Sequence, residues 1–353
     1  MESWNRGSGT MAEDDRASSE WGCLGVSLRF GYALGGRLMW LFSPSASAQF
    51  DMNGRTYRME ELIGEGGFSY VYRVVELESG RAFALKKILA QDQETLRSGH
   101  AEIEVFQEVR HANVLSLVDH SVVDVPDRPG AKEVLMLLPL STAGTLQDAL
   151  DATRSCDKRS EAGDALFFGE LEALQIFGGV CRGVLAFHEH EPPLAHNDIK
   201  PSNVLLNDDA SPLLMDFGST RPARRALHSR SDALALQEWA SINCTMPFRS
   251  PELFDPASDA VLDERTDVWS LGCLLYALLH GQSPFAVSDG GSVAIAVASG
   301  KVPFPKSARL YSDGVRSLIL AMLAADISQR CFLRGATQRA EMLRSQLEER
   351  SSS

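Results

Sequence analysis

Four polar side chains have the types and the spacing to move a phosphoryl group. Asp198, Lys200 and Asn203 lie in the run His-Asn-Asp-Ile-Lys-Pro-Ser-Asn, and Asp216 follows in the triplet Asp-Phe-Gly. Two carboxylates, an ammonium and an amide suit the transfer of a magnesium-bound phosphoryl group to a hydroxyl. Oxygen donors hold the hard cation, and the ammonium offsets the phosphate charge. We interpret the rest of the chain as support for this stretch.

A glycine-rich turn between two strands could bring backbone N–H groups to phosphate oxygens. Residues 57–63 and 70–75 have strand character, and Gly64, Glu65 and Gly66 lie in the turn between them. Glycine permits a close approach because it has no Cβ. The motif alone is weak evidence, since a plain hairpin turn would have a similar sequence. A dinucleotide-binding unit is disfavoured, because a strand rather than a helix follows the glycines.

The next two segments carry opposite charges. Residues 81–89 are predicted to form a strand in which Ala84 and Lys86 share the inward face, the alternative being a solvated lysine on an edge strand. Residues 94–109 have helical periodicity, and Glu102 lies beside the apolar face. In that position Glu102 could neutralise Lys86 and direct it toward a phosphate.

The remaining periodicity divides the chain into a β-rich part and a mainly helical part. Further strands are predicted at 114–123 and 134–140, which gives the first part five strands and one main helix. Helices are predicted to open at 144 and to span 170–188, 268–279 and 314–323, with a surface loop at 151–168. The predicted fold class is α+β and bilobal, with a small β-rich N-terminal lobe at 57–138, a hinge at 139–141 and a larger, mainly helical C-terminal lobe at 142–347.

Composition argues against several other classes of protein. The net charge of −13 disfavours a general nucleic-acid binder, which needs a surplus of lysine and arginine. The six cysteines include no C-x-x-C pair, so neither a zinc site nor a disulfide framework is expected. No apolar run reaches the roughly 18 residues of a membrane span. We expect residues 1–52 to be a disordered or weakly ordered N-terminal extension, with an interfacial or targeting element as the alternative.

Taken in order, the motifs resemble the signature of eukaryotic protein kinases. They are Gly64-x-Gly66, Val71, Ala84-x-Lys86, Glu102, His196-x-Asp198-x-Lys200-x-x-Asn203, Asp216-Phe217-Gly218 and Ser250-Pro251-Glu252. The resemblance covers residues 57–347 and implies a protein kinase fold that uses ATP and Mg²⁺. It also implies protein substrates with serine or threonine hydroxyls, because Lys200 and Thr245 are typical of that kinase type.

The resemblance implies a role for each polar residue. Lys86, held by Glu102, would bind the α- and β-phosphates of ATP. Asp198 would accept or orient the proton of the substrate hydroxyl, and Lys200 would steady the transferred group. The metal ligands would be Asn203 and Asp216, and the nucleotide-binding residues would be Gly64, Glu65, Gly66, Val71, Ala84, Lys86, Glu102, Leu138, Leu140 and Leu205.

It also implies structural contacts around the site. The side chains of Phe106, Leu117, His196 and Phe217 would form an internal stack that reports the active arrangement. Asp267 would bond the backbone of the catalytic loop. In the second lobe, Glu252 would pair with Arg330.

Three further stretches resemble the Numb-associated kinase family, and in particular a lipid-anchored branch with plant members. They are residues 64–71, the run Leu236-Gln237-Glu238-Trp239, and Cys244-Thr245 before 248–254. The resemblance implies a cytoplasmic kinase, peripheral to Golgi or endosomal membranes, that would act in membrane traffic or secretion. The start Met1-Glu2 lacks the Met-Gly required for N-myristoylation, which counts against a lipid anchor in the sequence as written.

Asn197 is the most informative departure from the kinase pattern. It replaces an arginine that, in many kinases, binds a phosphate on the activation loop. Without that charge the phosphate has no partner through which to order the loop. We therefore predict that the kinase is active without phosphorylation of its own loop.

Two alternatives remain to the active protein kinase. One is a pseudokinase-type scaffold that binds partners without turnover. Retention of Lys86, Asp198, Asn203 and Asp216 together argues against it, since a scaffold would not need all four. The other is a small-molecule phosphotransferase of similar shape, which Thr245 and the Ser-Pro-Glu motif disfavour.

Overall fold

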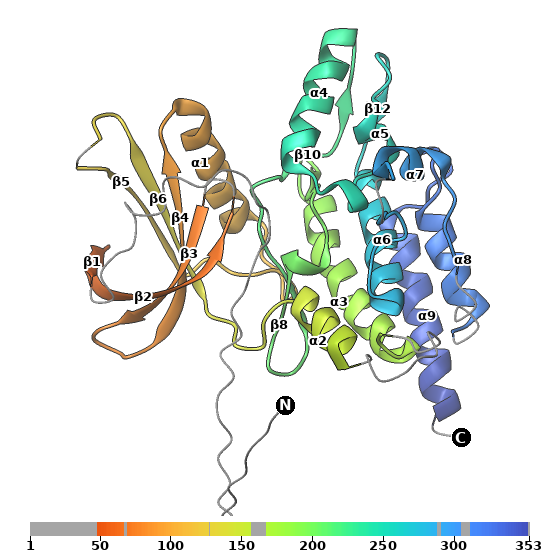
Figure 1. Ribbon diagram of the computed structural model, residues 1–353, viewed down its shortest axis with the longest axis horizontal. Coiled ribbons are helices and arrows are strands. Elements are labelled where there is room, and N and C mark those ends of the chain that lie inside the picture. Colours follow the sequence, from red (N-terminus) through yellow and green to blue (C-terminus); the bar gives the residue numbers. More distant parts are fainter. Residues whose placement is uncertain are drawn as a thin grey trace, which may run out of the picture.

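A computed structural model describes residues 48–351, apart from 67–68, 127, 157–166, 288–290 and 305–310. The described chain has two lobes, with strands β1–β6 and helix α1 in one and helices α2–α9 in the other (Figure 1). The predicted α+β, bilobal fold class is confirmed. No helix in the described part of the chain combines the length and the apolar character that crossing a membrane requires.

The N-terminal lobe is a six-stranded antiparallel sheet in the order β1-β2-β3-β4-β6-β5. Alternation of buried and exposed side chains gives the sheet an inner face, which shares the core with α1, and an outer face with its own apolar cluster. The strands are β1 (Gln49–Met52), β2 (Arg55–Glu65), β3 (Ser69–Glu76), β4 (Ala82–Ala90), β5 (Asp119–Asp124) and β6 (Lys132–Pro139).

The first strand corrects the predicted start of the fold. Residues 49–52 fall within the predicted extension but form β1, which pairs with β2. Met52 and Tyr57 are both buried in the outer cluster. The Asn53 side chain donates hydrogen bonds of 2.8 and 3.0 Å to Asp119 Oδ1 and the His120 carbonyl oxygen, and so joins the hairpin to the opposite edge strand. Residues 1–47, the rest of the predicted extension, lie outside the described residues.

Helix α1 (Gln93–Glu108) agrees with its prediction, whereas the strand after it begins later than predicted. Asp92 caps α1 by accepting a 2.7 Å hydrogen bond from the Thr95 N–H. The strand predicted at 114–123 starts only at Asp119, because residues 113–115 bond to the second lobe instead. Leu115 donates its N–H to the Leu214 carbonyl oxygen, and Leu214 donates its own to that of Asn113.

The C-terminal lobe is built around two buried helices. All residues from 266 to 279 in α6 are buried, as expected for a helix that is apolar on every side. Helix α3 packs on α6 and α9, and Gly183 lets it approach the first lobe, since a Cβ there would lie 2.6 Å from the Asn113 carbonyl oxygen. The helices are α2 (Leu146–Cys156), α3 (Glu170–His188), α4 (Arg230–Asn243), α5 (Pro251–Phe254), α6 (Arg265–His280), α7 (Val293–Ser299), α8 (Asp313–Met322) and α9 (Leu333–Ser351).

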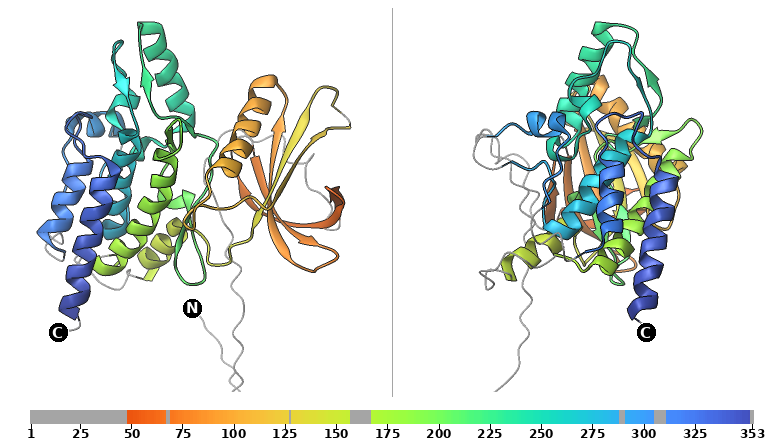
Figure 2. Two further views of the ribbon diagram at one scale, coloured as in Figure 1. Left: turned by 180° about the vertical axis from the view of Figure 1, so that it is seen from behind. Right: turned by 90° about the vertical axis from the view of Figure 1, so that its right-hand side faces the viewer.

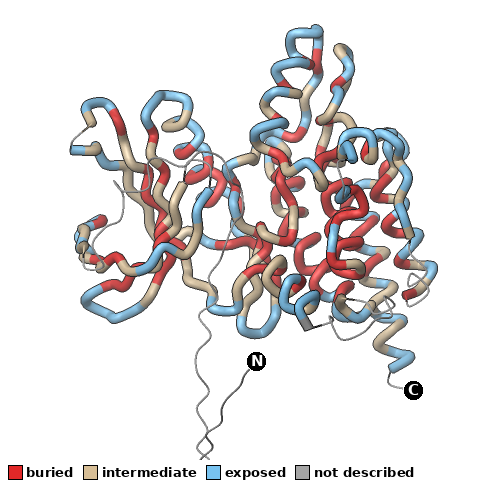
Figure 3. Tube along the Cα trace, in the orientation of Figure 1, coloured by how far each residue is buried: buried red, intermediate tan, exposed pale blue. Residues whose placement is uncertain are grey.

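The predictions at 170–188, 268–279 and 314–323 are confirmed, but the predicted loop at 151–168 is partly wrong. Helix α2 continues to Cys156, because its apolar positions Leu146 and Leu150 are fully buried at helical spacing. Residues 157–166 lie outside the described residues. The two turned views show the same arrangement of the lobes (Figure 2). The burial trace shows that much of the buried chain lies in the second lobe, where α3 and α6 carry most of it (Figure 3).

Helix α4 projects from the second lobe beside a small strand pair (Figure 1). Short antiparallel pairs hold this region: β10 (Arg221–Pro222) with β7 (Leu194–Ala195), and β11 (Arg225–Ala226) with β12 (Val261–Leu262). A third pair, β8 (Val204–Leu206) with β9 (Pro212–Leu214), lies near the hinge. Helix α4 has a separate apolar core, which includes Leu236, Ala240 and Leu253.

Candidate active site

A fully buried carboxylate holds the catalytic loop in place. Asp267, in the first turn of α6, accepts hydrogen bonds of 2.8 Å from the backbone N–H groups of His196 and Asn197. The ring of His188 lies 3.0 Å from the same carboxylate. Hydrogen bonds to an ionised acceptor are short and strong, so the loop backbone has little freedom. The predicted role of Asp267 is confirmed.

Asp198 is surrounded by donors that fix its orientation. One carboxylate oxygen accepts the Thr245 N–H at 2.9 Å, and the other lies 2.8 Å from Lys200 Nζ and 3.1 Å from Asn203 Nδ2. Lys200 also donates to Thr245 Oγ1 at 2.7 Å. Asp198 is buried, but 8% of its surface is still accessible to solvent. A carboxylate has about four lone-pair sites, and a substrate hydroxyl can therefore still bind to it.

Lys86 forms the charged link between the lobes. Its Nζ lies 2.6 Å from Glu102 Oε1 on α1 and 2.8 Å from Asp216 Oδ1. Burial opposes the ammonium charge, but Asp216 and Glu102 outweigh it and raise the pKa of Lys86. Burial raises the pKa of Glu102, although Lys86 acts in the opposite direction. The Lys86 ammonium lowers the pKa of the half-exposed Asp216 to about 2, so this carboxylate is ionised throughout the neutral range.

The apolar residues predicted around the nucleotide all contribute to the core that the two lobes share. Ala84 and Leu138 are directly opposite each other on β4 and β6, and both are buried. Val71, Leu140 and Leu205 are partly buried and pack against the same core. The five side chains thus come from both lobes and from the segment that joins them.

The glycine turn has the tight geometry expected of it at the residues that are described. Gly64 lies opposite Val71 on the neighbouring strand, and the Gly66 N–H donates to the Ser69 carbonyl oxygen at 2.8 Å. A Cβ at Gly66 would lie 2.9 Å from Ser69 Oγ, so a larger residue would require the Ser69 hydroxyl to move. Glu65 is exposed at the end of β2.

Two oxygen donors fit a magnesium ion, one on a residue bonded to Asp198 and one on a residue bonded to Lys86. Asn203 uses its amide nitrogen to bond Asp198, which leaves its side-chain oxygen available. Asp216 uses only Oδ1 for Lys86, and its second oxygen accepts no hydrogen bond from the described residues. Among those residues no cluster of three or more histidine, cysteine or acidic side chains could hold a metal ion alone. Magnesium is commonly held by one or two protein oxygens together with phosphate oxygens and water, so the pair is sufficient.

Aromatic rings connect this site to α1. The Phe217 ring centroid lies 4.5 Å from that of Phe106 and 5.8 Å from that of His196, while Leu117 is partly buried against the same core. The contacts of the Phe217 ring with Phe106 and His196 are therefore confirmed, and the place of Leu117 in the stack stays a prediction. Phe187 on α3, 5.2 Å from Phe217, is an additional member that the sequence analysis missed.

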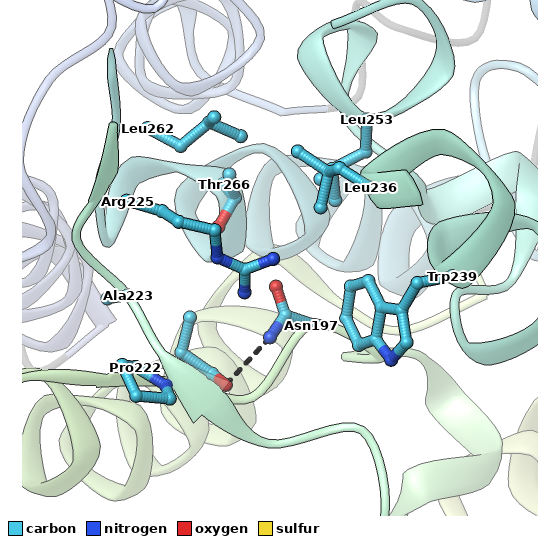
Figure 4. Close-up of a pocket in the computed structure, with 10 residues that line it drawn as sticks. Asn197, Pro222, Ala223, Arg225, Leu236, Trp239, Leu253, Leu262 and Thr266 are labelled. Carbon is cyan, nitrogen blue, oxygen red and sulfur yellow. Dashed lines mark hydrogen bonds between the residues drawn. The ribbon is translucent and has the colours of Figure 1, made fainter. Parts of the chain in front are cut away.

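Asn197 has a left-handed backbone and two carbonyl partners. Its φ is 65°, a conformation that asparagine adopts more readily than most residues. The side-chain nitrogen donates to the carbonyl oxygens of Ala195 at 2.9 Å and Ser219 at 3.1 Å. Figure 4 shows this amide beside a small cavity into which Arg225 extends from the β11 side and Trp239 from α4. Asn197 therefore ties the catalytic loop, residues 196–203, directly to the activation segment, which runs from the Asp-Phe-Gly triplet to the Ser-Pro-Glu motif, residues 216–252.

Further from the site, a buried ion pair supports the activation segment. Arg330 is fully buried and donates to both oxygens of Glu252, at 2.7 and 2.9 Å. Arg330 also donates to the carbonyl oxygens of Arg265 and Ala324. The predicted pair is confirmed, with bidentate geometry.

Besides Phe187, the sequence does not predict Ile63 or the contacts of a cluster around Trp239. Ile63 is partly buried against the nucleotide-side core, and its position directly before the glycine motif is the signal that could have identified it. The cluster of Arg221, Arg225 and Trp239 has no comparable signal, because tertiary folding brings it together across the activation segment.

Comparison with known proteins agrees with the geometry. The family described as "Protein kinase domain" matches residues 57–340. A probable serine/threonine-protein kinase of Dictyostelium discoideum is 35% identical over 83% of this chain and 95% of its own length. Serine/threonine-protein kinase 16 of Rattus norvegicus is 38% identical over 79% of this chain and 87% of its own length. Serine/threonine-protein kinase ENV7 of Saccharomyces cerevisiae is 31% identical over 81% of this chain and 91% of its own length. The chain belongs to the eukaryotic protein kinase family and is a serine/threonine protein kinase.

Proposed function

We propose that this kinase uses ATP and Mg²⁺, with Lys86 on the nucleotide phosphates, Asn203 and Asp216 on the metal, and Asp198 and Lys200 at the transferred group. The observation that carries the proposal is the position of Lys86 between Glu102 and Asp216. A buried lysine with two carboxylates is pre-oriented for anionic oxygens and stays charged. A scaffold that binds partners without turnover would not need this arrangement.

The adenine ring would lie among Val71, Ala84, Leu138, Leu140 and Leu205, below the turn formed by Gly64 and Gly66. Glu65 is exposed, and we assign it only a backbone contribution to that turn. An apolar slot of this kind supports binding of a flat ring, while the polar groups set the direction of the phosphates.

Phosphoryl transfer would depend mainly on positioning and on charge. The transition state is loose and spreads negative charge over the phosphoryl oxygens, which Lys200 would offset from its place 2.8 Å from Asp198. Asp198 would orient the substrate hydroxyl and take up its proton. Asn203 and Asp216 would hold the metal ion, which would supply positive charge to offset that of the phosphate groups. Thr245 links the peptide-binding side of the activation segment to both Asp198 and Lys200.

We also propose that the kinase is active without phosphate on its activation segment. Asn197 offers no positive charge to a phosphate, and it already bonds the Ser219 carbonyl oxygen. Four residues in this region, Ser219, Thr220, Ser229 and Ser231, are the phosphate acceptors to monitor, together with Ser241. Unphosphorylated protein, verified by mass spectrometry, is expected to be as active as protein that has been allowed to autophosphorylate. Loss of activity on phosphatase treatment would contradict this proposal.

The resemblance to the Numb-associated kinase family supports a cytoplasmic kinase that acts at Golgi or endosomal membranes in secretory traffic. It rests on residues 64–71, 236–239 and 244–254. Fractionation of cells that express the full chain, followed by a carbonate wash, tests it. We expect the kinase in the membrane fraction and its release by the wash if the association is peripheral. Recovery only in the supernatant before the wash would contradict membrane association.

The enzymatic assignment is tested by transfer of labelled γ-phosphate from Mg·ATP to casein. Lys86→Ala is expected to abolish transfer. Lys87→Ala is a matched control, because Lys87 is the adjacent lysine and pairs with Glu133 at 3.1 Å, away from the site. Equal loss in both variants would show that the effect is not specific to Lys86. Binding of Mg·ATP without labelling of any protein would favour the scaffold.

A further inference from the structure

Two arginines of the activation segment have an aromatic ring as their partner rather than an acid. The guanidinium carbon of Arg221 lies 4.1 Å from the Trp239 ring centroid, and that of Arg225 lies 5.7 Å from it. Neither arginine forms an ion pair with any residue in the described part of the chain. Arg225 extends into the cavity between Asn197 and Trp239 (Figure 4). The indole thus connects β10 and β11 with α4.

The electrostatics of this cluster favour an electron-rich partner. Burial lowers the pKa of Arg221 and of Arg225, and the charge of Arg225 lowers that of Arg221 further. Two neighbouring guanidinium groups repel each other, and an aromatic face offsets part of that cost through its quadrupole. Trp239 supplies such a face to both of them. Without the ring, two unpaired cations would lie beside the catalytic loop.

A chain of hydrogen bonds runs from Trp239 to the catalytic loop. Asn243 donates from its side chain to the Trp239 carbonyl oxygen at 2.8 Å, and its own carbonyl oxygen accepts Ser219 Oγ at 2.7 Å. The Ser219 carbonyl oxygen accepts Asn197 Nδ2 at 3.1 Å. Two residues after Asn243, the Thr245 N–H bonds Asp198. The end of α4 is therefore joined to the catalytic loop at two neighbouring residues, Asn197 and Asp198.

We propose that Trp239 is a positioning residue that takes the place of an activation-loop phosphate. In kinases that carry arginine where this chain has Asn197, a phosphate holds the segment by pairing with cations. Here the indole holds it by stacking with Arg221 and Arg225, and the bonds through Asn243 and Ser219 transmit that position to Asp198. The inference rests on the proposed activity without loop phosphate, and it identifies what supports that activity.

The proposal predicts a specific change in kinetics. Trp239→Ala is expected to lower kcat/KM for the protein substrate roughly 5- to 30-fold, as the loss of two cation–π contacts implies. KM for ATP should stay near the wild-type value, because the nucleotide residues lie on other elements. Trp239→Phe keeps an aromatic face and should recover much of the loss. Leu234→Ala, also on α4 and 48% exposed, is the control for general damage to the helix.

A second test compares the activity of variants that differ only in the charge at position 239. A purely structural role of Trp239 would give no difference between them. Trp239→Glu and Trp239→Gln have side chains of nearly equal size, but only the first offers the arginines a carboxylate. Trp239→Glu should therefore retain more activity than Trp239→Gln. Sulfate should partly restore Trp239→Ala when compared with chloride at matched ionic strength, and should leave the wild-type enzyme without gain. Equal activity of the Glu and Gln variants, with no sulfate effect, would overturn the proposal.

Substitutions of the two arginines test the same contacts independently, in case the Trp239 variants fail to fold. Arg221→Gln and Arg225→Gln should each lower kcat/KM for the protein substrate and leave KM for ATP unchanged. A normal kcat/KM in both variants would contradict the proposal. The same assay separates the two claims. If unphosphorylated wild-type enzyme is inactive, the proposed phosphate-independent function fails. If it is active and Trp239→Ala matches it, only the role of Trp239 fails.

Discussion

Glu102→Gln is expected to separate activity from stability. The substitution keeps the shape of the side chain but removes the charge 2.6 Å from Lys86 Nζ. Removing one partner of a buried ion pair typically costs about 3–5 kcal/mol, because the other charge is left uncompensated. Here Asp216 remains 2.8 Å from Lys86, so the ammonium keeps a partner. The Lys86 ammonium would then pair only with Asp216, whose carboxylate we assign to the metal ion.

From this geometry we expect a loss of transition-state stabilisation of about 2–3 kcal/mol, below the full cost of an orphaned charge. That corresponds to a fall in kcat/KM for ATP of roughly 30- to 150-fold. Folding stability should change much less, because burial raises the pKa of Glu102 and its charge is itself costly to bury. The two expectations together distinguish an active-site defect from unfolding.

Steady-state kinetics at varied ATP, combined with urea unfolding monitored by tryptophan fluorescence, test this prediction. Glu104→Gln is the matched control, because Glu104 is on the same helix and exposed to solvent. It should leave both kinetics and stability near the wild-type values. Unchanged kcat/KM in Glu102→Gln would refute the role assigned to the pair. If the free energy of unfolding of Glu102→Gln falls by as much as the loss in activity requires, the prediction that activity falls without unfolding is refuted.

Three further substitutions test other parts of the structure. Arg330→Met should destabilise the second lobe by about 3–5 kcal/mol in urea unfolding, since it leaves the Glu252 carboxylate without its cation; a change below 1 kcal/mol would contradict this. Met52→Ala should destabilise the protein by about 2–5 kcal/mol, because the side chain is 2% exposed in the outer cluster, and wild-type stability would show that β1 is dispensable. His280→Gln should reduce the loss of stability as pH falls from 6.5 to about 4. Burial lowers the pKa of His280 to about 4, so the unfolded chain takes up the proton first; an unchanged pH profile would contradict this.

The polar residues of the site were predictable because the sequence places them at short, fixed intervals. Asp198, Lys200 and Asn203 lie within six residues, and the loop backbone that sets their geometry is local. Glu102 was predictable from helical phase and Lys86 from strand alternation, since both periods are properties of single elements. The fold class followed from the same periods.

The features that the sequence does not predict differ from these, because each depends on contacts with a residue far away in the chain. β1 is four residues long, and its burial depends on the outer face of the sheet. The strand predicted from 114 starts late because Leu115 bonds Leu214 in the other lobe. Trp239 was noted only as part of a family stretch, and its contacts with Arg221 and Arg225 arise only when α4 folds back onto β10 and β11.

The central claim is that Asp198 serves phosphoryl transfer from a site that is complete without loop phosphate. Single-turnover transfer from Mg·ATP to a protein substrate, with unphosphorylated wild-type enzyme and Asp198→Asn, tests it most directly. We predict transfer by the wild type and a rate roughly 10²- to 10⁴-fold lower for Asp198→Asn, the range typical of a lost general base. ATP binding should be retained in both. Equal rates, or no transfer by the wild-type enzyme, would contradict the claim.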